Sequence, residues 1–305
     1  MDSVPAALLA RHDLLAAGVT ERELRRSLRA GEMAVVRPGA YVAAGDERLR
    51  DAQARHALLV AATVARLHPD AVVSHVSAAV LHGLPVWGIP LDRVHATRAR
   101  RSGARRGGVA HLHAAALDGD EIVVVGGVPV TSPARTLVDL ARTVPFESAV
   151  VTADAALRAG LSRSGTALDA ALLRASHRPG ISAARRAVAF ADGRSESVGE
   201  SRSRAALARF GVPAPELQDK VWSADGESLG RVDFRWRGTV GEFDGRMKYG
   251  RLLRPGQEPG DAVFEEKRRE DAIRDAGLQV VRWVWDELGR FDLVVPRLLR
   301  AFARA

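Results

Sequence analysis

Apolar and polar residues alternate along the chain in short blocks, each typical of one helix or one strand. In the first clear block, Leu24 and Leu28 lie four residues apart, which predicts a helix with a stripe facing inward. Thr20 and Glu23 form a capping-box pattern ahead of this stripe, and Gly31 stands where a helix would end. A shorter helix is predicted before this segment, and a hairpin with a Pro-Gly turn after it.

The middle of the chain mixes helical and strand patterns. A helical run covers residues 46–68, and a short strand followed by a helix capped by Ser74 comes next. Further strand patterns follow, and a Gly-Gly pair joins the last two in a predicted hairpin. Ser132 and Pro133 then open a helix as its N-cap and first helical residue. From 146 to 193 apolar residues recur near every 3.6 positions and predict three helices.

The last hundred residues show another order: a helix, three strands, a helix, a strand and a final amphipathic helix. Leu207 and Phe210 are predicted to face inward from the first of these helices. In the second strand Val232 and Phe234 alternate with Asp233, so the apolar side chains point to the core and the carboxylate points away. This αβββαβ order is typical of the restriction-endonuclease-like fold.

Together these patterns predict an α+β multidomain chain. Helix, turn, basic helix and hairpin over residues 1–45 is the order of a winged helix-turn-helix, a DNA-binding domain whose second helix enters the major groove. We expect an α/β domain over 46–165, a helical connector over 166–194, and an αβββαβ nuclease-like domain over 195–305.

Composition indicates a class of partner. The 305 residues include 45 Lys and Arg against 37 Asp and Glu, and the formal charge of +8 comes mostly from arginine. The planar fork of donors in arginine suits phosphate and guanine, so nucleic acid is the first partner to consider. A GC-rich genome, which enriches arginine and alanine throughout, is the other explanation. The absence of cysteine excludes disulfides and thiolate zinc sites.

No targeting or membrane segment is expected. Charged residues interrupt the N-terminal segment before a signal-peptide core develops, and no apolar stretch is long enough to span a bilayer. We therefore expect a cytoplasmic, bacterial protein without a membrane partner.

The basic residues of the first domain gather on one predicted helix face. Four of them lie at i, i+3, i+4 and i+7, roughly opposite the leucines. With one arginine of the hairpin they form the predicted DNA-binding set: Arg22, Arg25, Arg26, Arg29 and Arg37. The alternative is a solvated basic face on a small helical domain. The basic loop from Arg98 to Gly108 would either touch phosphates or be simply solvated.

Three segments carry a resemblance to a known family. The stretches "GVTERELRRSLRAGEMAVVRPGAYV", "AVVSHVSAAVLHGL" and "GVPVTSPARTLVDLAR" resemble the AbiEi-type (type IV) antitoxins. The resemblance lies in the N-terminal half of the chain. It implies a DNA-binding regulator with a cognate toxin as partner.

The strand "TVGEFDG" places Glu242 and Asp244 two residues apart on one face. Unpaired buried carboxylates are costly, so this face is either solvated or beside a positive group. Asp233 and Glu242, from neighbouring strands, are the predicted ligands of Mg²⁺, with Mn²⁺ as a substitute, and Glu200 on the leading helix is the accessory acid. The ion would polarise a phosphodiester and lower the pKa of an attacking water.

The same region resembles the very-short-patch-repair-type nucleases of the PD-(D/E)XK class, through "GES", "RVDF", "EFDGRMKY" and "EEKRRED" before "GLQVVRW". These nucleases carry a lysine two residues after the second acid, where this chain has Asp244. Lys248 or Lys267 would then supply the positive charge from another position. In the alternative interpretation, Glu200 only pairs with Arg204, and the charged helix is a solvated face with i,i+4 ion pairs.

Histidines offer a weaker signal. His75 and His82 fall on one predicted helix, and His111 and His113 share a strand face. No acidic or cysteine partner is spaced with them in a recognisable zinc motif. We therefore expect these histidines to pack or to bind backbone.

Two functions follow from the sequence. The first is a DNA-binding, Mg²⁺-dependent endonuclease in phage defence, toxin–antitoxin control or DNA repair, with RNA as a substrate that the sequence does not separate from DNA. The second is an antitoxin-like transcriptional regulator that keeps the nuclease fold without the reaction.

Overall fold

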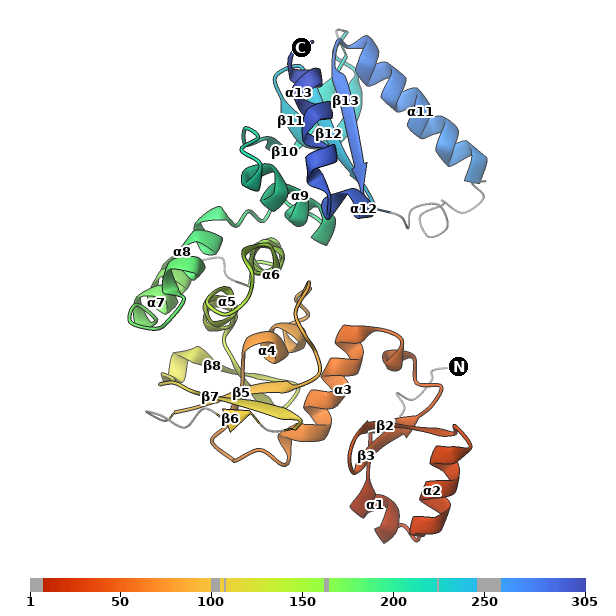
Figure 1. The fold of residues 1–305 in the computed structure, drawn as a ribbon, viewed down its shortest axis with the longest axis vertical. Coiled ribbons are helices and arrows are strands. Elements are labelled where there is room, and N and C mark those ends of the chain that lie inside the picture. Colours follow the sequence, from red (N-terminus) through yellow and green to blue (C-terminus); the bar gives the residue numbers. More distant parts are fainter. Residues whose placement is uncertain (1–7, 100–104, 107, 162–164, 224, 246–258) are drawn as a thin grey trace. The chain divides into compact units, whose positions relative to one another are not determined.

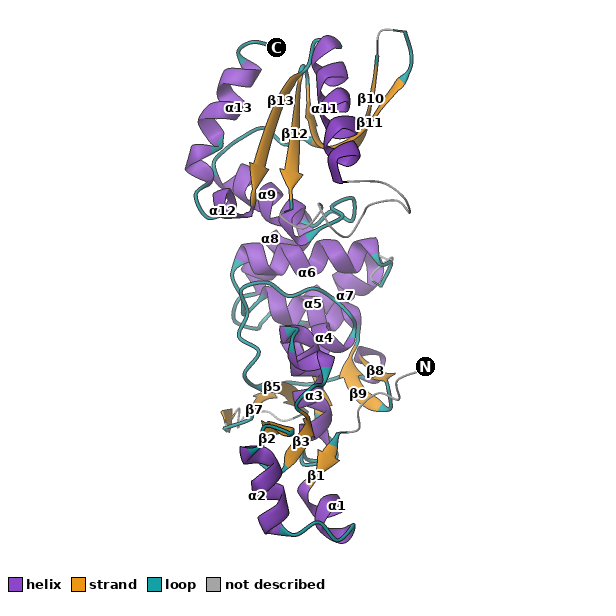
Figure 2. Ribbon diagram, turned by 90° about the vertical axis from the view of Figure 1, so that its right-hand side faces the viewer, coloured by secondary structure: helices purple, strands orange, loops and turns teal. Residues whose placement is uncertain are grey.

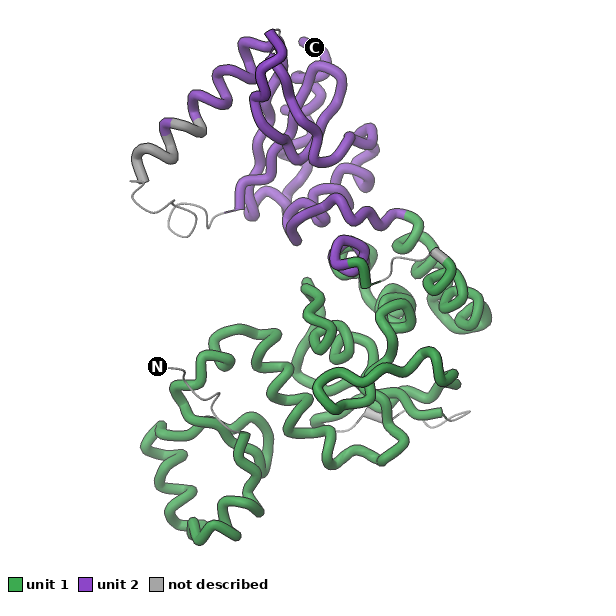
Figure 3. Tube along the Cα trace, turned by 180° about the vertical axis from the view of Figure 1, so that it is seen from behind, with its two compact units in different colours: residues 1–152, 160–189 green, residues 153–159, 190–305 purple. Residues whose placement is uncertain are grey.

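The structure is a computed structural model that describes residues 8–99, 105–106, 108–161, 165–223, 225–245 and 259–305 (Figure 1). It is a mixed α+β chain with three separate sheets. The chain divides into two compact units (Figure 3). Unit 1 holds residues 1–152 and 160–189, and unit 2 holds residues 153–159 and 190–305.

Unit 1 begins with two helices and a small sheet. The elements are β1 (Leu9–Ala10), α1 (Arg11–Ala16), α2 (Glu21–Arg29), β2 (Met33–Arg37) and β3 (Ala40–Ala43). The sheet has the order β1-β3-β2, with β3 antiparallel to both neighbours. The predicted capping box is confirmed, because the Thr20 hydroxyl accepts from the Glu23 backbone while the Glu23 carboxylate accepts from the Thr20 backbone. Leu24 is buried under this helix, as its spacing predicted.

A six-stranded sheet forms the centre of unit 1. After η1 (Glu47–Leu49) and α3 (Ala52–Val64), its elements are β4 (Val72–Val73), α4 (His75–Leu81), β5 (Val94–Arg98), β6 (Arg105–Arg106), β7 (Ala110–Ala114), η2 (Gly119–Glu121), β8 (Ile122–Val125) and β9 (Val128–Thr131). The strand order is β6-β7-β5-β4-β9-β8. Pairing is mixed: β4 with β9 and β5 with β7 are parallel, and the predicted β8–β9 hairpin is antiparallel. Leu59, Val60 and Ala78 from α3 and α4 pack on its central strands.

Two details of this region differ from the sequence prediction. The helical run expected over 46–68 is interrupted, because the Asp51 side chain accepts from the Ala54 backbone and starts α3 there. Ser74 does stand before α4, but its side chain does not cap the helix. Its hydroxyl instead contacts His75 Nδ1 at 3.0 Å and accepts from the Thr97 hydroxyl at 2.8 Å.

A layer of helices follows, made of α5 (Pro133–Ala141), α6 (Phe146–Arg158), α7 (Gly165–Arg174) and α8 (Ile181–Phe190). Ser132 accepts from the Arg135 backbone, and Pro133 occupies the first turn of α5, so the predicted helix start is confirmed. Small side chains from three of these helices pack against one another: Ala141, Ala149, Ala184 and Ala187.

One arginine of α5 is almost entirely buried. Arg135 is 1% exposed, and its Nε donates to Asp139 at 2.7 Å. Its Nη1 donates to Glu121 at 2.8 Å and to the carbonyl of Ala116 at 3.1 Å. Arg142 adds a second cation on Asp139, at 3.0 Å. These buried charges are therefore paired and hydrogen-bonded, as buried ions must be.

Unit 2 has one four-stranded sheet. Its elements are α9 (Val198–Arg209), β10 (Glu216–Trp222), β11 (Ser228–Trp236), β12 (Thr239–Asp244), α11 (Pro259–Asp275), β13 (Gln279–Val284), α12 (Trp285–Leu288), η3 (Phe291–Leu293) and α13 (Val295–Phe302). The strand order is β10-β11-β12-β13, and β12 runs parallel to β13 while the other pairs are antiparallel. The predicted element order of this region is confirmed, with the short α12 as an addition.

Helices cover both faces of this sheet, and Figures 1 and 2 show α11 and α13 on opposite sides of β12 and β13. One core cluster joins Leu207 of α9 and Leu298 of α13 to Phe234 and Trp283. On the other face Ile273 of α11 packs with residues that include Val232 and Val240. Phe210 was expected to face inward, and this was wrong: it ends α9 and is 40% exposed.

A buried ion pair ties α6 to α9 within unit 2. Arg204 Nη1 donates to Asp154 Oδ2 at 2.6 Å, and the Asp154 side chain is fully buried. The backbone N–H of Asp192 donates to the other oxygen of the same carboxylate, at 2.8 Å. Burial raises the pKa of Asp154, and the Arg204 guanidinium opposes that shift.

Among the described residues, every helix is too short or too polar to cross a membrane.

Candidate functional site

The acidic residues predicted from the sequence lie in unit 2, on α9, β11 and β12. Hydrogen bonds join β11 to β12 from Trp236↔Thr239 to Phe234↔Gly241. Continuing this register by one residue sets Asp233 opposite Glu242, on the same face. The ladder does not continue there, because Asp233 Oδ2 accepts the backbone N–H of Phe243 at 2.8 Å. The Asp233 side chain therefore takes over a role that a strand backbone would fill.

Gln218 connects two of the acidic groups. Its side-chain amide donates to Glu200 Oε2 at 2.8 Å and to Asp233 Oδ1 at 3.3 Å. The residue has a positive φ of 55°, which is unusual for a non-glycine residue and is found disproportionately at functional sites. Gln218 is not among the residues predicted from the sequence, since one polar residue in a strand pattern gives no sign of such a backbone conformation.

Glu200 is fixed at the start of α9. Its Oε1 accepts from the Ser197 hydroxyl at 2.8 Å, and its Oε2 also accepts from the backbone N–H of Glu196 at 2.8 Å. The alternative pairing with Arg204 does not occur, because that guanidinium binds Asp154. Glu200 is 8% exposed, so its carboxylate is held in place and largely shielded from solvent.

Two arginines compensate the Glu242 carboxylate, which is 7% exposed. Arg282 faces it in the parallel β12–β13 register and donates to Oε2 at 2.8 Å. Arg269 of α11 contacts Oε1 at 2.8 Å. Arg282 also reaches Asp244 at 3.6 Å and Glu270 at 3.1 Å. The positive group that the paired carboxylates require is thus present, and it comes from β13 and α11.

The two lysines predicted for the site are not among the residues that contact these carboxylates in the contacts above. Lys267 lies on α11 and is exposed, and Lys248 lies outside the described residues. Glu200, Asp233 and Glu242 do not form a set of three whose ligand oxygens all lie within 4.8 Å of one another; the set that does, within the described part of the chain, consists of histidines. The acidic site is therefore a row of carboxylates linked by Gln218 and two arginines.

The predicted DNA-binding arginines divide into two groups. Those of α2 are all exposed, with Leu24 buried on the opposite side: Arg22, Arg25, Arg26 and Arg29. Arg37 differs from the expectation, since it is 9% exposed and its Nε donates to the carbonyl of Ala62 at 2.7 Å. It connects the hairpin to α3, and we remove it from the DNA-binding set. Most of the basic loop from Arg98 to Gly108 lies outside the described residues, while Arg98 itself binds Asp70 at 2.6 Å.

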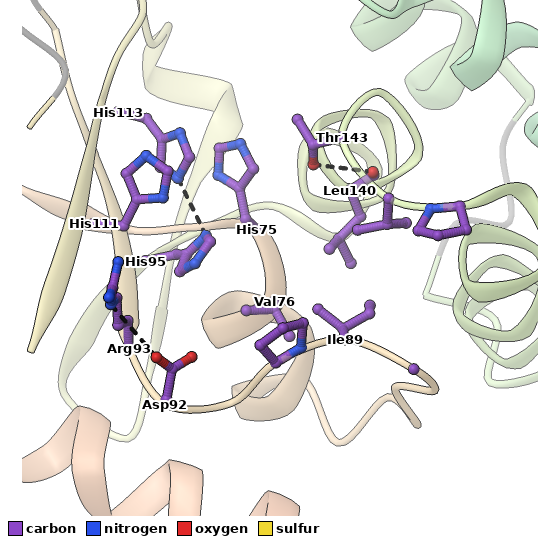
Figure 4. Close-up of a pocket in the computed structure, with 14 residues that line it drawn as sticks. His75, Val76, Ile89, Asp92, Arg93, His95, His111, His113, Leu140 and Thr143 are labelled. Atoms are coloured by element: carbon purple, nitrogen blue, oxygen red, sulfur yellow. Dashed lines mark hydrogen bonds and ion pairs between the residues drawn. The ribbon is translucent and has the colours of Figure 1, made fainter. Parts of the chain in front are cut away.

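The histidines occupy two environments. His82 Nε2 contacts the carbonyl of Thr131 at 2.8 Å, so the expected backbone contact is confirmed for this residue. The others gather with a fourth histidine, His95 of β5, at one end of a cavity of about 710 Å³ in unit 1 (Figure 4). His95 is paired with His111 in the parallel β5–β7 register, and His113 follows two residues later on the same face. His75 approaches them from the start of α4.

Contacts within this histidine cluster (His75, His95, His111 and His113) are close. His113 Nε2 lies 3.1 Å from His95 Nδ1. The rings of His75 and His113 stack with centroids 3.7 Å apart, and those of His111 and His113 stack at 4.0 Å. Burial, followed by repulsion from the neighbouring histidines, lowers the pKa of His113 to about 2. Burial also holds the pKa of His75 well below its usual range, so both rings are neutral at pH 7.

Comparison with known proteins adds relatives without a stated activity. No family model matches the chain. Over 112 residues the chain is 41% identical to the uncharacterized proteins Rv2248 (strain ATCC 25618 / H37Rv) and MT2308 (strain CDC 1551 / Oshkosh) of Mycobacterium tuberculosis. The match covers 37% of this chain and 41% of the length of each relative. A solved structure, that of the RV2827C protein from Mycobacterium tuberculosis, is similar with a TM-score of 0.37 at 15% identity, over 71% of this chain and 84% of that one.

Proposed function

We propose that this chain is a DNA-binding protein whose unit 2 carries a phosphodiesterase site of the restriction-endonuclease type that depends on a divalent cation. The observation that carries the proposal is the fixed row of carboxylates at the end of the sheet. Gln218 connects Glu200 to Asp233, and Asp233 and Glu242 lie on the neighbouring strands β11 and β12. Residues far apart in the sequence thus lie on α9 and on the three neighbouring strands β10, β11 and β12.

The residue types present are those that bind a hard cation. Mg²⁺ binds in proteins through one or two carboxylates together with water and substrate phosphate. Asp233 and Glu242 supply such oxygens from adjacent strands, and two arginines already compensate the charge of Glu242. When bound, the ion would polarise the phosphodiester and favour ionisation of the attacking water. Glu200 and Asp244 would assist, and Lys248 or Lys267 would contact the phosphate.

The α1–α2–hairpin order of unit 1 supports the DNA-binding part of the proposal. In a winged helix-turn-helix the second helix enters the major groove, and here that helix is α2 with its exposed arginines. The resemblance to AbiEi-type antitoxins favours a role in phage defence or toxin–antitoxin control, with a toxin as a proposed partner.

A second candidate is a transcriptional regulator without nuclease activity. Both oxygens of Glu242 are bound by arginines, and Asp244 stands where the nuclease family has lysine. Permanent guanidinium partners would then replace the cation, and the fold would serve binding alone.

One assay separates the two candidates. Wild-type protein is incubated with supercoiled plasmid, linear duplex or RNA, with Mg²⁺, Mn²⁺ or a chelator. We expect DNA strand breaks that appear with the metal and disappear with the chelator. Stable DNA binding without cleavage under any of these conditions would support the regulator instead, and failure to bind any nucleic acid would contradict both.

The arginines of α2 should dominate the salt dependence of DNA binding. Each phosphate contact contributes about 0.9 to the slope of log K against log salt concentration. We expect the double variant Arg25→Ala, Arg29→Ala to lower that slope by about 2 in fluorescence anisotropy titrations. The control variant Arg185→Ala, Arg186→Ala removes two exposed arginines of α8 and should leave the slope unchanged. Equal slopes for wild type and the α2 variant would exclude this face.

A further inference from the structure

We propose that the histidine cluster of unit 1 is a binding site for one divalent transition-metal ion, with Zn²⁺ as the natural candidate, and with one coordination position open to the adjacent cavity. The ligands are His75, His95 and His113. This site is separate from the acidic site of unit 2 and differs from it in ligand chemistry, since imidazole suits Zn²⁺, Cu²⁺ or Ni²⁺, whereas carboxylate and water suit Mg²⁺.

Distances between the ring nitrogens support this assignment. Candidate ligand nitrogens of His75, His95 and His113 all lie within 4.8 Å of one another. Zinc–nitrogen bonds of about 2.0–2.1 Å in a tetrahedron place two ligand nitrogens about 3.3 Å apart. The 3.1 Å separation between His113 Nε2 and His95 Nδ1 is close to that value. Two of the three ligand atoms therefore already stand at nearly the spacing that a shared ion requires.

The fold holds the three proposed ligand rings on regular secondary structure. His95 and His113 share one face of the β5–β7 ladder, so neither depends on a loop for its position. Ser74 Oγ contacts His75 Nδ1, so Nε2 is the His75 nitrogen that we assign to the ion.

His75 also has an unusual backbone. Its φ is +52°, although it is neither glycine nor in a turn between strands, and it is the first residue of α4. Non-glycine residues in this region cost about 1–3 kcal/mol and cluster at sites of binding or catalysis. The His75 ring lies against the β5–β7 face, where it stacks on that of His113 (Figure 4). Because imidazole binds a metal in its ring plane, both rings coordinate one ion only when one of them turns out of this stack.

The cavity beside the cluster leaves space for a fourth ligand that does not come from the protein, so three histidine ligands are sufficient. Zinc sites with three histidines keep a fourth position for water or a small ligand, in contrast to closed structural sites. Here Ile89, Leu140 and Val144 form apolar parts of the lining, and the Asp92–Arg93 ion pair, 3.4 Å long, contributes polar groups. A small anion or a carbonyl compound is the class of ligand that such a position would take.

Cobalt titration tests the proposal directly. Protein without a histidine tag is treated with a chelator, and Co²⁺ is added in the presence of excess Mg²⁺. We expect one equivalent to bind with the intense visible absorption of a four- or five-coordinate site, and Zn²⁺ to displace it. Azide should shift the band by binding at the open position. Absence of such a spectrum in the wild type would overturn the site, and the 3.1 Å contact would then be a hydrogen bond between two imidazoles.

Variants locate the ion. His95→Ala and His113→Ala should each weaken Co²⁺ binding by at least about 100-fold. The matched control His12→Ala removes a histidine whose side chain is 85% exposed and should bind as the wild type does. Glu242→Ala should also leave the titration unchanged, which separates this site from the acidic one. If both cluster variants bind as tightly as the wild type, or if azide has no effect on the spectrum, the proposed ligands or the open position are wrong.

Discussion

Replacing Arg135 by methionine should lower the free energy of unfolding by about 3–5 kcal/mol, which would be among the largest effects of a single substitution in unit 1. This residue is 1% exposed, and its side chain is bound by Asp139 and Glu121, which are also buried. Without it, Glu121 loses its closest cation and Asp139 keeps mainly Arg142. A buried carboxylate without a compensating charge destabilises the folded state far more than the same carboxylate in a buried ion pair.

Urea unfolding followed by circular dichroism measures this effect, provided that the transition of unit 1 is resolved from that of unit 2. Arg174 is the matched control, because it binds Asp118 and Asp120 while remaining 37% exposed. Arg174→Met should cost less than about 1 kcal/mol, as exposed ion pairs do. A loss for Arg135→Met no greater than that of the control would show that the buried network does not stabilise the fold.

Asp233→Asn and Glu242→Ala should each reduce metal-dependent DNA cleavage by at least about 1,000-fold, since a bound cation contributes several kcal/mol and each 1.36 kcal/mol is tenfold in rate. DNA affinity should stay within about twofold of wild type, because the proposed DNA-binding arginines lie on α2 in unit 1. Asp233→Asn keeps the shape of the side chain and an oxygen to accept from Phe243 N–H, so loss of activity would report on charge.

Glu227→Ala is the control for this pair, since Glu227 is an exposed acid at the start of the β11 segment. It should cleave at the wild-type rate. The cleavage rate measured over a range of Mg²⁺ concentrations is a second readout. A variant that lacks a metal ligand needs a higher Mg²⁺ concentration for cleavage. A variant that only disturbs the fold loses activity at every Mg²⁺ concentration. Cleavage by Glu242→Ala at the wild-type rate would remove the site assignment altogether.

Local patterns predicted the elements of this fold well. The capping box at Thr20, the Ser132–Pro133 helix start and the β8–β9 hairpin are all set by residues within a few positions of one another. Such signals act over one turn of helix or one strand pair, so all the residues that make up each signal are neighbours in the sequence. Phe210 was misplaced because its helix ends there, and the helical period no longer determines which way a side chain points.

The acidic site could be predicted only in part. Alternation gave the shared face of Glu242 and Asp244, but their partner Arg282 lies 40 residues from Glu242 and is brought there by the parallel register of β12 and β13. Arg269 reaches the same carboxylate from α11, a helix whose charged pattern is equally typical of a solvated face. No spacing rule in the sequence connects these positions.

The place of His95 in the histidine cluster was not predicted, for the same reason. His95 becomes a neighbour of His111 and His113 only once β5 and β7 pair, and β6 lies between these strands in the sequence. His75 and His82 are seven residues apart and fall on one predicted helix. They lie in different surroundings because His75 is the first residue of α4, whereas His82 caps its C-terminal end.

The Asp154–Arg204 pair determines where the chain can be divided. A fragment that starts at Ser195 would follow the domain boundary expected from the sequence, but it would leave the guanidinium of Arg204 without its buried anion. Residues 153–159 belong to unit 2 although residues 160–189 return to unit 1. Unit 2 is therefore better studied by substitutions in the intact chain than by truncation.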